Sequence, residues 1–399
     1  MSRPLLALCG VGILCAAAAA QGTFPLERKA AEMSQMPALR MGIRFCGRQA
    51  GPTQGLKGVP PDAAKANMFF ALRVSGGIRW AVSLPGEAPA LLVDTDNDKD
   101  FSDEKPLTGN AEGSSIDFGT VDIALGNRGT VTVRLIGNAQ KPGDAPRYML
   151  TVPGAYRTGT VKLAGKSYAL ALLDNSMNGR YDDAFDVSVG QNGTDGLGLD
   201  LNANGTFDPP RGLAGPFEVM LLGKRLRIQD AFYSVAVAAD GSSITLKRIE
   251  PGYGTLDFGR QAKQFMAYSD YGVTVGSTGA DGTARLPAGK YSFLRIAMTK
   301  TDESGEAWQL TMSDPPEALK AVDIRKGGTT RVAIGPPLAA KVDIRQRGRQ
   351  AYLGLLLKGR AGEQYVPGVT KAQRRLPPPQ FTVLGEDGQE VYSGTFEYG

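Results

Sequence analysis

The chain has 399 residues, with 45 Lys and Arg against 40 Asp and Glu, so its formal net charge at pH 7 is only +5. It contains no histidine, which excludes a Ser-His-Asp triad, a Cys-His nucleophile pair and an HExxH zinc site because each depends on an imidazole. Among enzyme mechanisms, catalysis by paired carboxylates or by a Ser-Lys pair remains compatible with this composition.

Residues 1–20 predict a secretory signal peptide. Arg3 precedes an apolar run from Leu5 to Ala20, and the run ends in small residues before Gln21, which is the order of charge, core and cleavage site in such a signal. The run is about 16 residues long, shorter than the roughly 20 that a membrane-spanning helix needs. We therefore expect cleavage after Ala20, a secreted or periplasmic mature protein, and no transmembrane segment after cleavage.

Two of the three cysteines lie in this signal, so the mature chain keeps Cys46 alone. It can form no internal disulfide, although export would permit one. Its stability must therefore come from its core and from bound ions. The length predicts two or three domains, since one domain typically holds roughly 100–200 residues.

The sequence predicts an all-β, multi-domain protein made of antiparallel, sandwich-like units with little helix. Glycine and proline are frequent, at 52 and 25 residues, and they separate short apolar or alternating runs, as strands and turns require. The predicted strands include Ile78–Leu84, Thr130–Ile136, Ser167–Leu173, Phe232–Ala238 and Ala351–Leu357. Helix is predicted only for Leu26–Met36 and, more weakly, for Pro61–Asn67.

After the signal peptide we divide the chain into four parts. They are an N-terminal segment 21–39, a β-rich region 40–265, a small sandwich 266–335 and a C-terminal β-unit 338–399, with Pro336 and Pro337 as a linker. The β-rich region contains one short phrase twice, at 116–119 and at 256–259, where the residues read Ile or Leu, then Asp-Phe-Gly. The phrase is compatible with a structural repeat or with chance.

Two loops in the β-rich region follow the pattern D-x-[DNS]-x-[DN]-G-x-[FY]-D, beginning at Asp174 and at Asp200. Oxygen side chains at positions 1, 3 and 5 can converge on one hard cation, and glycine at position 6 allows the sharp turn that brings the position 7 carbonyl to the ion. The aromatic residue at position 8 is expected to anchor the loop in the core. Carboxylates at the end of the pattern close the site, and the adjacent Asp182 and Asp183 make the loop at Asp174 our best single candidate.

A third loop, which comes first in the chain, begins at Asp94 and is the most acidic. It keeps Asp at positions 1, 3 and 5 and Phe101 at position 8, but it has Lys99 where glycine is expected. We therefore expect a poorer turn there, compensated by additional carboxylate charge. The candidate calcium ligands of the three loops are Asp94, Asp96, Asp98 and Asp100; Asp174, Ser176, Asn178, Arg180, Asp182 and Asp183; and Asp200, Asn202, Asn204, Thr206 and Asp208.

These loops resemble the calcium loops of EF-hand, dockerin and integrin-type β-propeller proteins, which implies Ca²⁺ as the bound ion. None has the Glu at position 12 of a regular EF-hand, because Lys105, Phe185 and Arg211 occupy that position. The residues before each loop are apolar and strand-like, so we expect calcium sites between strands and not paired helices. The alternative is that these loops are ordinary exposed turns, which also favour Asp, Asn and Gly.

Further along the chain, Asp281-Gly282 is followed by Leu286-Pro287-Ala288-Gly289 and then Tyr291. The segment resembles the hairpin of carboxypeptidase-regulatory-like, transthyretin-type β-domains over about residues 270–335. The resemblance implies a small antiparallel sandwich that commonly serves as a non-catalytic module.

Positive charge concentrates in the C-terminal unit. Between Lys341 and Arg375 nine basic residues stand against two acidic ones, a local net charge of +7. This basic cluster could bind an anionic cell-envelope polymer or polysaccharide, or it could be a set of solvated strand faces. Nucleic acid is not an expected partner, because the chain is exported and has no known binding module.

Two functional hypotheses follow from these patterns. The first is a secreted calcium-binding β-protein with a non-catalytic binding or structural role, in which calcium rigidifies the loops. The alternative is a calcium-dependent carbohydrate-active enzyme or lectin-like module. Trp80 and Trp308 are the only tryptophans, so platforms for stacking sugars are few.

Overall fold

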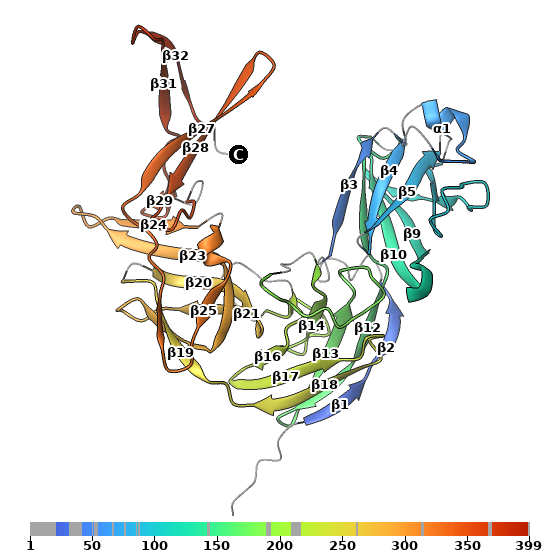
Figure 1. The fold of residues 1–399 in the computed structure, drawn as a ribbon, viewed down its shortest axis with the longest axis horizontal. Helices are drawn as coiled ribbons and strands as arrows, with labels where there is room; N and C mark the ends of the chain where they lie inside the picture. The colour runs from blue at the N-terminus through green and yellow to red at the C-terminus, as the bar shows by residue number, and fades with distance from the viewer. Residues whose placement is uncertain are drawn as a thin grey trace, which may run out of the picture.

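The structure is a computed structural model that describes residues 21–397, except 32–41, 50, 52–54, 66–67, 76, 85, 87, 142–143, 189–192, 209–216, 261, 313–314 and 366–368. The predicted signal peptide, residues 1–20, lies outside the described residues. Strand makes up 56% of the structure and helix 3%, which confirms the predicted all-β class with several antiparallel sheets. The described strands form three packed modules followed by two hairpins (Figure 1).

The first module is a nine-stranded sheet in the order β7-β6-β5-β4-β3-β11-β10-β9-β8. Because β7 and β8 stand at opposite edges of the sheet and only Gly109 separates them in the chain, the sheet must curl until its edges meet around the core. The strands are β3 (Arg44–Gln49), β4 (Phe69–Val74), β5 (Gly77–Leu84), β6 (Ala90–Val93), β7 (Leu107–Thr108), β8 (Asn110–Glu112), β9 (Ser115–Ala124), β10 (Thr130–Asn138) and β11 (Tyr148–Pro153).

The second module is a sandwich of two sheets, in the orders β1-β18-β17-β16 and β15-β14-β13-β12-β2. Leucines of β13 and β14 pack with Leu226, Ile244 and Leu246 of the facing sheet in one core. The strands are β1 (Gln21–Pro25), β2 (Glu27–Ala30), β12 (Ala155–Leu163), β13 (Lys166–Leu173), β14 (Gly196–Leu199), β15 (Val219–Leu221), β16 (Arg225–Ile228), β17 (Ala231–Val237) and β18 (Ser243–Ile249).

The prediction of a helix over Leu26–Met36 is wrong for its described part. Residues 27–30 form β2, which pairs with β12, and residues 21–25 form β1, which pairs with β18. Each strand completes an edge of one sheet of the second module, so backbone pairing across the sandwich overrides the local helical pattern. Residues 32–36 lie outside the described residues.

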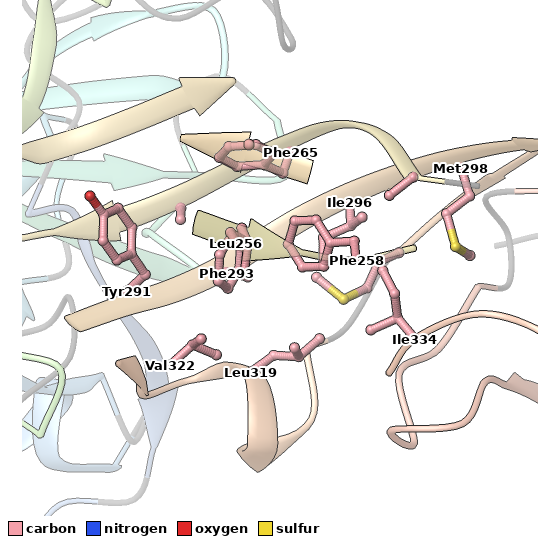
Figure 2. Packing of buried hydrophobic residues seen from close by; sticks show 14 of the residues in the cluster. Leu256, Phe258, Phe265, Tyr291, Phe293, Ile296, Met298, Leu319, Val322 and Ile334 are labelled. Atoms are coloured by element: carbon pink, nitrogen blue, oxygen red, sulfur yellow. The ribbon is translucent and has the colours of Figure 1, made fainter. Parts of the chain in front are cut away.

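The third module is a sandwich of a three-stranded sheet, β22-β19-β26, and a larger sheet that runs β21-β20-β23-β24-β29-β30, with β25 pairing to β23. Figure 2 shows its core, where Phe258, Phe265 and Phe293 gather beside Leu256 and Tyr291. The strands are β19 (Tyr253–Asp257), β20 (Ala262–Ser269), β21 (Gly272–Ser277), β22 (Thr283–Pro287), β23 (Gly289–Thr301), β24 (Ala307–Thr311), β25 (Val322–Ile324), β26 (Thr329–Arg331), β29 (Val369–Lys371) and β30 (Arg374–Arg375).

The described strands do not follow the divisions that we predicted between domains. Residues 40–265 contain the whole of the first module and part of the second, and the predicted boundary at 265/266 falls inside β20. The segment that resembles a hairpin contributes β22 to one sheet and β23 to the other, so the turn at Ala288 connects the two layers of the sandwich.

Two hairpins extend beyond the third module. They are formed by β27 (Ala339–Arg347) with β28 (Gln350–Lys358), and by β31 (Gln380–Leu384) with β32 (Glu390–Thr395). Between them, Tyr365 and β29 return to the core and sheet of the third module. The hairpins carry exposed apolar side chains, among them Ile344, Tyr352 and Val391.

Several local predictions are confirmed. The five predicted strands correspond to β5, β10, β13, β17 and β28, and the weaker predicted helix is present as α1 (Pro61–Lys65). The repeated Asp-Phe-Gly phrase shares two local contacts at its two sites, although it lies within β9 at the first and extends past the end of β19 at the second. Asp117 and Asp257 each accept the N–H of the glycine two residues later at 2.9 Å, and each pairs with an arginine of a neighbouring strand, Arg134 or Arg331.

Candidate metal centre

The three acidic loops begin directly after β6, β13 and β14. The strand flanks agree with the prediction and differ from the helices of an EF-hand. The position 1 carboxylates Asp94, Asp174 and Asp200 are 0%, 3% and 5% exposed. Because β13 and β14 are antiparallel neighbours, the second and third loops lie at opposite ends of their sheet.

The three loops share one backbone conformation, with positive φ at positions 4 and 6. A left-handed conformation costs a non-glycine residue about 1–2 kcal/mol, so its recurrence indicates that the turn is required by the fold of each loop. The turn therefore forms in the first loop as well, although a lysine replaces glycine there. The φ values are 70° at Asn97 and 66° at Lys99, 53° at Met177 and 80° at Gly179, and 60° at Ala203 and 80° at Gly205.

The aromatic residue at position 8 anchors each loop, as predicted. Phe101 is 2% exposed and packs in a cluster with Phe69 and Val82 of the first module. Tyr181 belongs to the core of the second module, and Phe207 packs against the cluster between the first two modules. Each loop is thus held at its strand end and again at position 8, which leaves positions 1 to 5 as a closed turn of polar groups.

Three carboxylates converge in the first loop. Single oxygens of Asp94, Asp96 and Asp98 all lie within 4.8 Å of one another, with Asp94 buried and the other two exposed. Asp100, the fourth predicted ligand, is instead turned to Ser102, whose N–H and hydroxyl it accepts at 2.9 and 2.6 Å. The structure therefore brings together three of the four predicted carboxylates of this loop.

Asp94 is an uncompensated carboxylate in the interior. Neither of its oxygens accepts a hydrogen bond from the part of the chain that the structure describes. Burial raises its pKa, and the charges of Asp96 and Asp98 raise it further. The N–H groups of Asn97 and Lys99 lie close enough to lower that pKa, but their geometry is too poor for hydrogen bonds. A buried carboxylate without partners is unfavourable unless a proton or a cation compensates its charge.

In the second loop the position 1 carboxylate is satisfied by the protein itself. Asp174 accepts the N–H of Asn178 at 3.1 Å and of Gly179 at 2.7 Å, together with the hydroxyl of Ser176 at 3.0 Å. The closing carboxylate is Asp183, which accepts from the side chains of Ser176 at 2.9 Å and Asn178 at 2.7 Å. Asp182 forms a bidentate ion pair with Arg180 at 2.7 and 3.0 Å, outside this network.

The third loop repeats this arrangement. Asp200 accepts the N–H of Asn204 at 3.2 Å and of Gly205 at 2.9 Å, and the closing Asp208 accepts from the side-chain amides of Asn202 and Asn204 at 3.0 Å each. An incoming cation would require these two amides to turn and present their oxygens. In the first loop, aspartates occupy positions 3 and 5, and an ionised carboxylate has no hydrogen to donate. The side chains there therefore cannot make the contacts that Asn202 and Asn204 make with Asp208.

Position 7 was expected to contribute a carbonyl oxygen. Arg180 and Thr206 occupy it in the second and third loops, and each donates its N–H to the side-chain oxygen of the position 5 asparagine, at 2.8 and 2.9 Å. The hydroxyl of Thr206 donates to the same oxygen of Asn204 at 2.8 Å. These contacts hold position 7 over the turn.

A second carboxylate, which sequence reasoning missed, supports each loop. Glu104 accepts the N–H of Thr95 at 2.6 Å, Asp195 accepts the N–H of Asp183 at 2.9 Å, and Glu218 accepts three N–H groups of the third loop at 2.9 to 3.0 Å. Asp195 and Glu218 are 0% exposed. The available signal was weak: an isolated acidic residue stands directly before a short apolar strand, β14 or β15.

The geometry changes the ranking of the loops. We predicted that the second loop was the best candidate because of its adjacent aspartates, but one of the pair turns to Arg180. The first loop instead presents a convergent set of three carboxylates with an unpaired buried member. Because hard cations such as Ca²⁺ prefer carboxylate oxygens, the first loop is the stronger of the three candidates for an ion site.

Two hollows lie in the second half of the molecule, and one of them borders the third loop. One of about 780 Å³ opens between the second and third modules; Tyr253, Phe232 and Tyr271 line it, and Leu201 and Asn202 of the third loop border it. The other, of about 830 Å³, lies beside the first hairpin and contains Trp308 among leucines and prolines. A concave surface with aromatic side chains is therefore present next to one acidic loop.

Comparisons with known proteins identify no relative of this chain. Neither family models, curated proteins nor solved structures match this chain. Within the described residues, none of the helices combines the length and the apolar character needed to cross a membrane.

Proposed function

We propose that this chain is an exported calcium-binding β-protein whose role is structural or binding and not catalytic. In this proposal, calcium ions rigidify the loops that connect strands. The observation that carries it is Asp94, a fully buried carboxylate without a hydrogen-bond partner beside two further aspartates. A divalent cation would compensate this charge without requiring any rearrangement of the strands.

Calcium is the favoured ion because of the donors. The first loop offers carboxylate oxygens, and the second and third offer carboxylate, amide and hydroxyl oxygens; the chain has no histidine for softer metals. Ca²⁺ takes six to eight such oxygens in a flexible geometry. Extracellular calcium sites bind at about 0.1–1 mM, which suits a site whose task is to order a loop where calcium is plentiful.

The binding of calcium should stabilise the folded chain by mass action. For a site with a Kd of about 0.1–1 mM, calcium at about 10 mM adds about 1.4–2.7 kcal/mol to the free energy of unfolding. We expect thermal melting of the full chain to shift upward with calcium and to return with chelator. An unchanged melting temperature would contradict the proposal.

The sharpest test replaces Asp94 by Asn, which keeps the shape of the side chain and removes its charge. Equilibrium dialysis should count one calcium ion fewer per chain for Asp94→Asn than for the unmodified protein. The matched control is Asp103→Asn, because Asp103 lies in the same loop but is exposed and outside the convergent set. Equal stoichiometry in both variants would rule out the first loop as a site.

A second candidate function is calcium-dependent carbohydrate recognition or hydrolysis, and the cleft beside the third loop is what favours it. Arg285 stacks over the ring of Tyr253 at 4.1 Å, and Arg227 lies 5.7 Å from the ring of Phe232. Binding sites for small molecules are typically lined by aromatic side chains with a few neighbouring polar groups. Ordering of Leu201 and Asn202 by calcium would then shape one rim of the cleft.

A glycan array and a panel of polysaccharide substrates, each run with calcium and with chelator, test this second candidate. We expect binding that weakens with chelator and that Tyr253→Ala abolishes. The absence of binding and of turnover on every glycan would leave only the structural role. Hydrolysis of any substrate would instead favour an enzyme and contradict the non-catalytic proposal.

The third module fits the proposed non-catalytic role. Its segment 281–291 resembles that of carboxypeptidase-regulatory-like, transthyretin-type domains, and its two layers share a dense aromatic core. We propose that this module positions the C-terminal hairpins, whose basic cluster would meet an anionic envelope polymer or polysaccharide.

A further inference from the structure

The second acidic loop reaches into two modules at once. Met177, at position 4, is 0% exposed and belongs to the core of the first module, whereas Tyr181, at position 8, belongs to the core of the second. Gly179 lies against the turn at the end of β9, where an added Cβ would be 3.4 Å from Leu125 and 3.8 Å from the carbonyl oxygen of Arg128. Five residues of one loop therefore span the junction between the modules.

Arg44 of β3 attaches the first module to the backbone of this loop. Its guanidinium donates to the carbonyl oxygen of Asn175 at 3.2 Å and to that of Ser176 at 2.9 Å. A small apolar cluster continues the junction along β10–β13 and includes Ile136, Val152, Tyr156 and Leu173. The conformation of the loop and the contact between modules are thus coupled through the same few residues.

Asp195 brings a further carboxylate to this loop from the segment before β14. It is 0% exposed, and its Oδ2 accepts the N–H of Asp183 at 2.9 Å, whereas its Oδ1 accepts no hydrogen bond within the described structure. The N–H of Ser176 lies close enough to lower the pKa of Asp195, but its geometry is too poor for a hydrogen bond. Burial raises its pKa to about 9, with the charge of Asp174 as the next cause and that of Asp183 as a smaller one. The unpaired oxygen thus belongs to a group of three carboxylates that act on one another electrostatically, although single oxygens of the three do not all lie within 4.8 Å of one another as those of the first loop do.

These three carboxylates lack a compensating cation. In the described structure no lysine or arginine forms an ion pair with Asp174, Asp183 or Asp195; Arg180 is paired with Asp182, and its charge acts on Asp183 and Asp195 without an ion pair. Arg44 contacts loop carbonyl oxygens, and its charge acts on Asp174 only at longer range. Buried charges in proteins are normally paired or bound to metals, so this group is a site that a divalent cation would complete.

We propose that Asp195 completes a calcium site in the second loop and that the ion bound there fastens the first module to the second. The remaining ligands come from positions 1, 3 and 5 and from the closing carboxylate: Asp174, Ser176, Asn178 and Asp183. The inference rests on the proposed function for the identity of the ion. It adds a ligand from outside the loop pattern and gives the bound ion a task, the attachment of the first module to the second.

The mechanism follows from the connections of the ligands. The loop follows β13 and Asp195 precedes β14, so an ion held by both joins the ends of two neighbouring strands. With Asp195 ionised and bound, the loop is held at the position where Met177 fills the first core. Without the ion, the connection between the two strand ends is absent, so the loop opens more readily, and each opening removes Met177 and the contacts of Arg44 from the first module.

The experiment is hydrogen exchange of the full chain with calcium and with chelator, combined with equilibrium dialysis of calcium. At about ten times the Kd, an ion that binds only the closed loop slows exchange through local opening about tenfold. We expect this slowing at residues 174–183 and also at 42–49 and 124–131, which belong to the first module and contact the loop. Slowing of exchange in the first loop, 94–104, tests the proposed calcium binding separately.

Asp195→Asn is the decisive variant, because it keeps the shape of a buried side chain and removes its charge. It should bind one calcium ion fewer and lose the calcium-dependent slowing at 42–49 and 124–131, while 94–104 is still slowed. Asp94→Asn should show the reverse pattern. The control is Asp186→Asn in the same segment, since among the described residues Asp186 accepts hydrogen bonds from Ser188 alone, and this variant should leave both effects unchanged.

The outcomes separate the two proposals. Slowing at 94–104 alone in the unmodified chain, or full stoichiometry and full slowing in Asp195→Asn, overturns the site at the junction and leaves the proposed function standing. Slowing at none of the three loops overturns both. Slowing confined to 174–183, without any at 42–49 or 124–131, supports an ion in the loop but overturns its role between modules.

Discussion

At the scale of single residues, Lys99 has the conformation that glycine has in the other two loops. Its φ of 66° costs about 1–2 kcal/mol, whereas glycine would lose about 0.5–1 kcal/mol in extra chain entropy. We therefore expect Lys99→Gly to be more stable than Lys99→Ala by about 1 kcal/mol. Comparing the two variants cancels the loss of the lysine charge, which both share.

Fluorescence of Trp80 during calcium-free urea unfolding measures this difference. Trp80 lies on β5, and its carbonyl oxygen accepts the N–H of Asp94 at 2.9 Å, so it reports on the first module. A Trp308→Phe background removes the other tryptophan. Equal midpoints for the Gly and Ala variants would mean that the loop does not hold its left-handed turn in solution.

The motif and the structure assign different roles to two adjacent aspartates in the second loop. The motif counts Asp182 as the closing carboxylate, but the structure bonds Asp182 to Arg180 and Asp183 to the side chains at positions 3 and 5. Loss of a group that holds or orients a metal ligand typically lowers metal affinity about 10- to 100-fold. We expect that loss from Asp183→Asn and a much smaller one from Asp182→Asn in calcium titrations. The opposite order would favour the motif.

At the scale of secondary-structure elements, the strands that close the second module are the clearest departure from the sequence. Leu26, between β1 and β2, is 7% exposed, packs in the core of that module and donates its N–H to Ser242 at 2.8 Å. Truncating a buried leucine typically costs about 2–5 kcal/mol. Leu26→Ala should lower the free energy of unfolding of the second module by that amount, and its calorimetric transition temperature with it. The exposed Glu27→Ala should leave that transition temperature unchanged. An unaffected transition would mean that this strand is not part of the folded sandwich.

Much of the fold could be predicted from the sequence because it depends on local patterns. Alternating runs such as Ser167–Leu173 became strands, and the spacing of Asp, Gly and aromatic residues correctly located the loops at strand ends. The roles of Asp195 and Glu218 could not be predicted, because these residues reach their loops from separate segments. They lie 12 and 10 residues beyond the closing carboxylates that they contact. Leu26 was misjudged because its partners, β12 and β18, are more than 100 residues away in the chain.

At the scale of the whole molecule, the chain forms a curved row of modules, with the nine-stranded sheet at one end and the C-terminal hairpins at the other (Figure 1). The acidic loops lie in the first two modules, and the basic cluster lies in the hairpin region. The acidic loops and the basic cluster are therefore local concentrations of opposite charge at separate places along the molecule, whose net charge is only +5. Such separation favours a partner that meets one end alone.

The basic cluster provides the last prediction. Arg345 is paired with Asp343, and Lys371 is paired with Asp302 and Glu306. Arg347 and Arg349, at the tip of the first hairpin, are exposed and have no such ion pair in the described structure. We expect the protein to be retained by dextran sulfate and not by uncharged dextran, with retention falling steeply between about 0.05 and 0.5 M NaCl as screening shortens the Debye length. Substituting both arginines by Glu should abolish retention.

The control for this double charge reversal is Lys162→Glu with Lys166→Glu, which changes the same charge at the exposed turn between β12 and β13. If retention depends only on total charge, both double variants will elute together, and the hairpin has no special role. If the hairpin tip is the binding surface, the control will still be retained. Calcium should not alter this retention, because the loops proposed to bind it lie in other modules; a calcium-dependent change would instead indicate that the polymer binds at the acidic loops, where a bound ion could bridge it to the carboxylates.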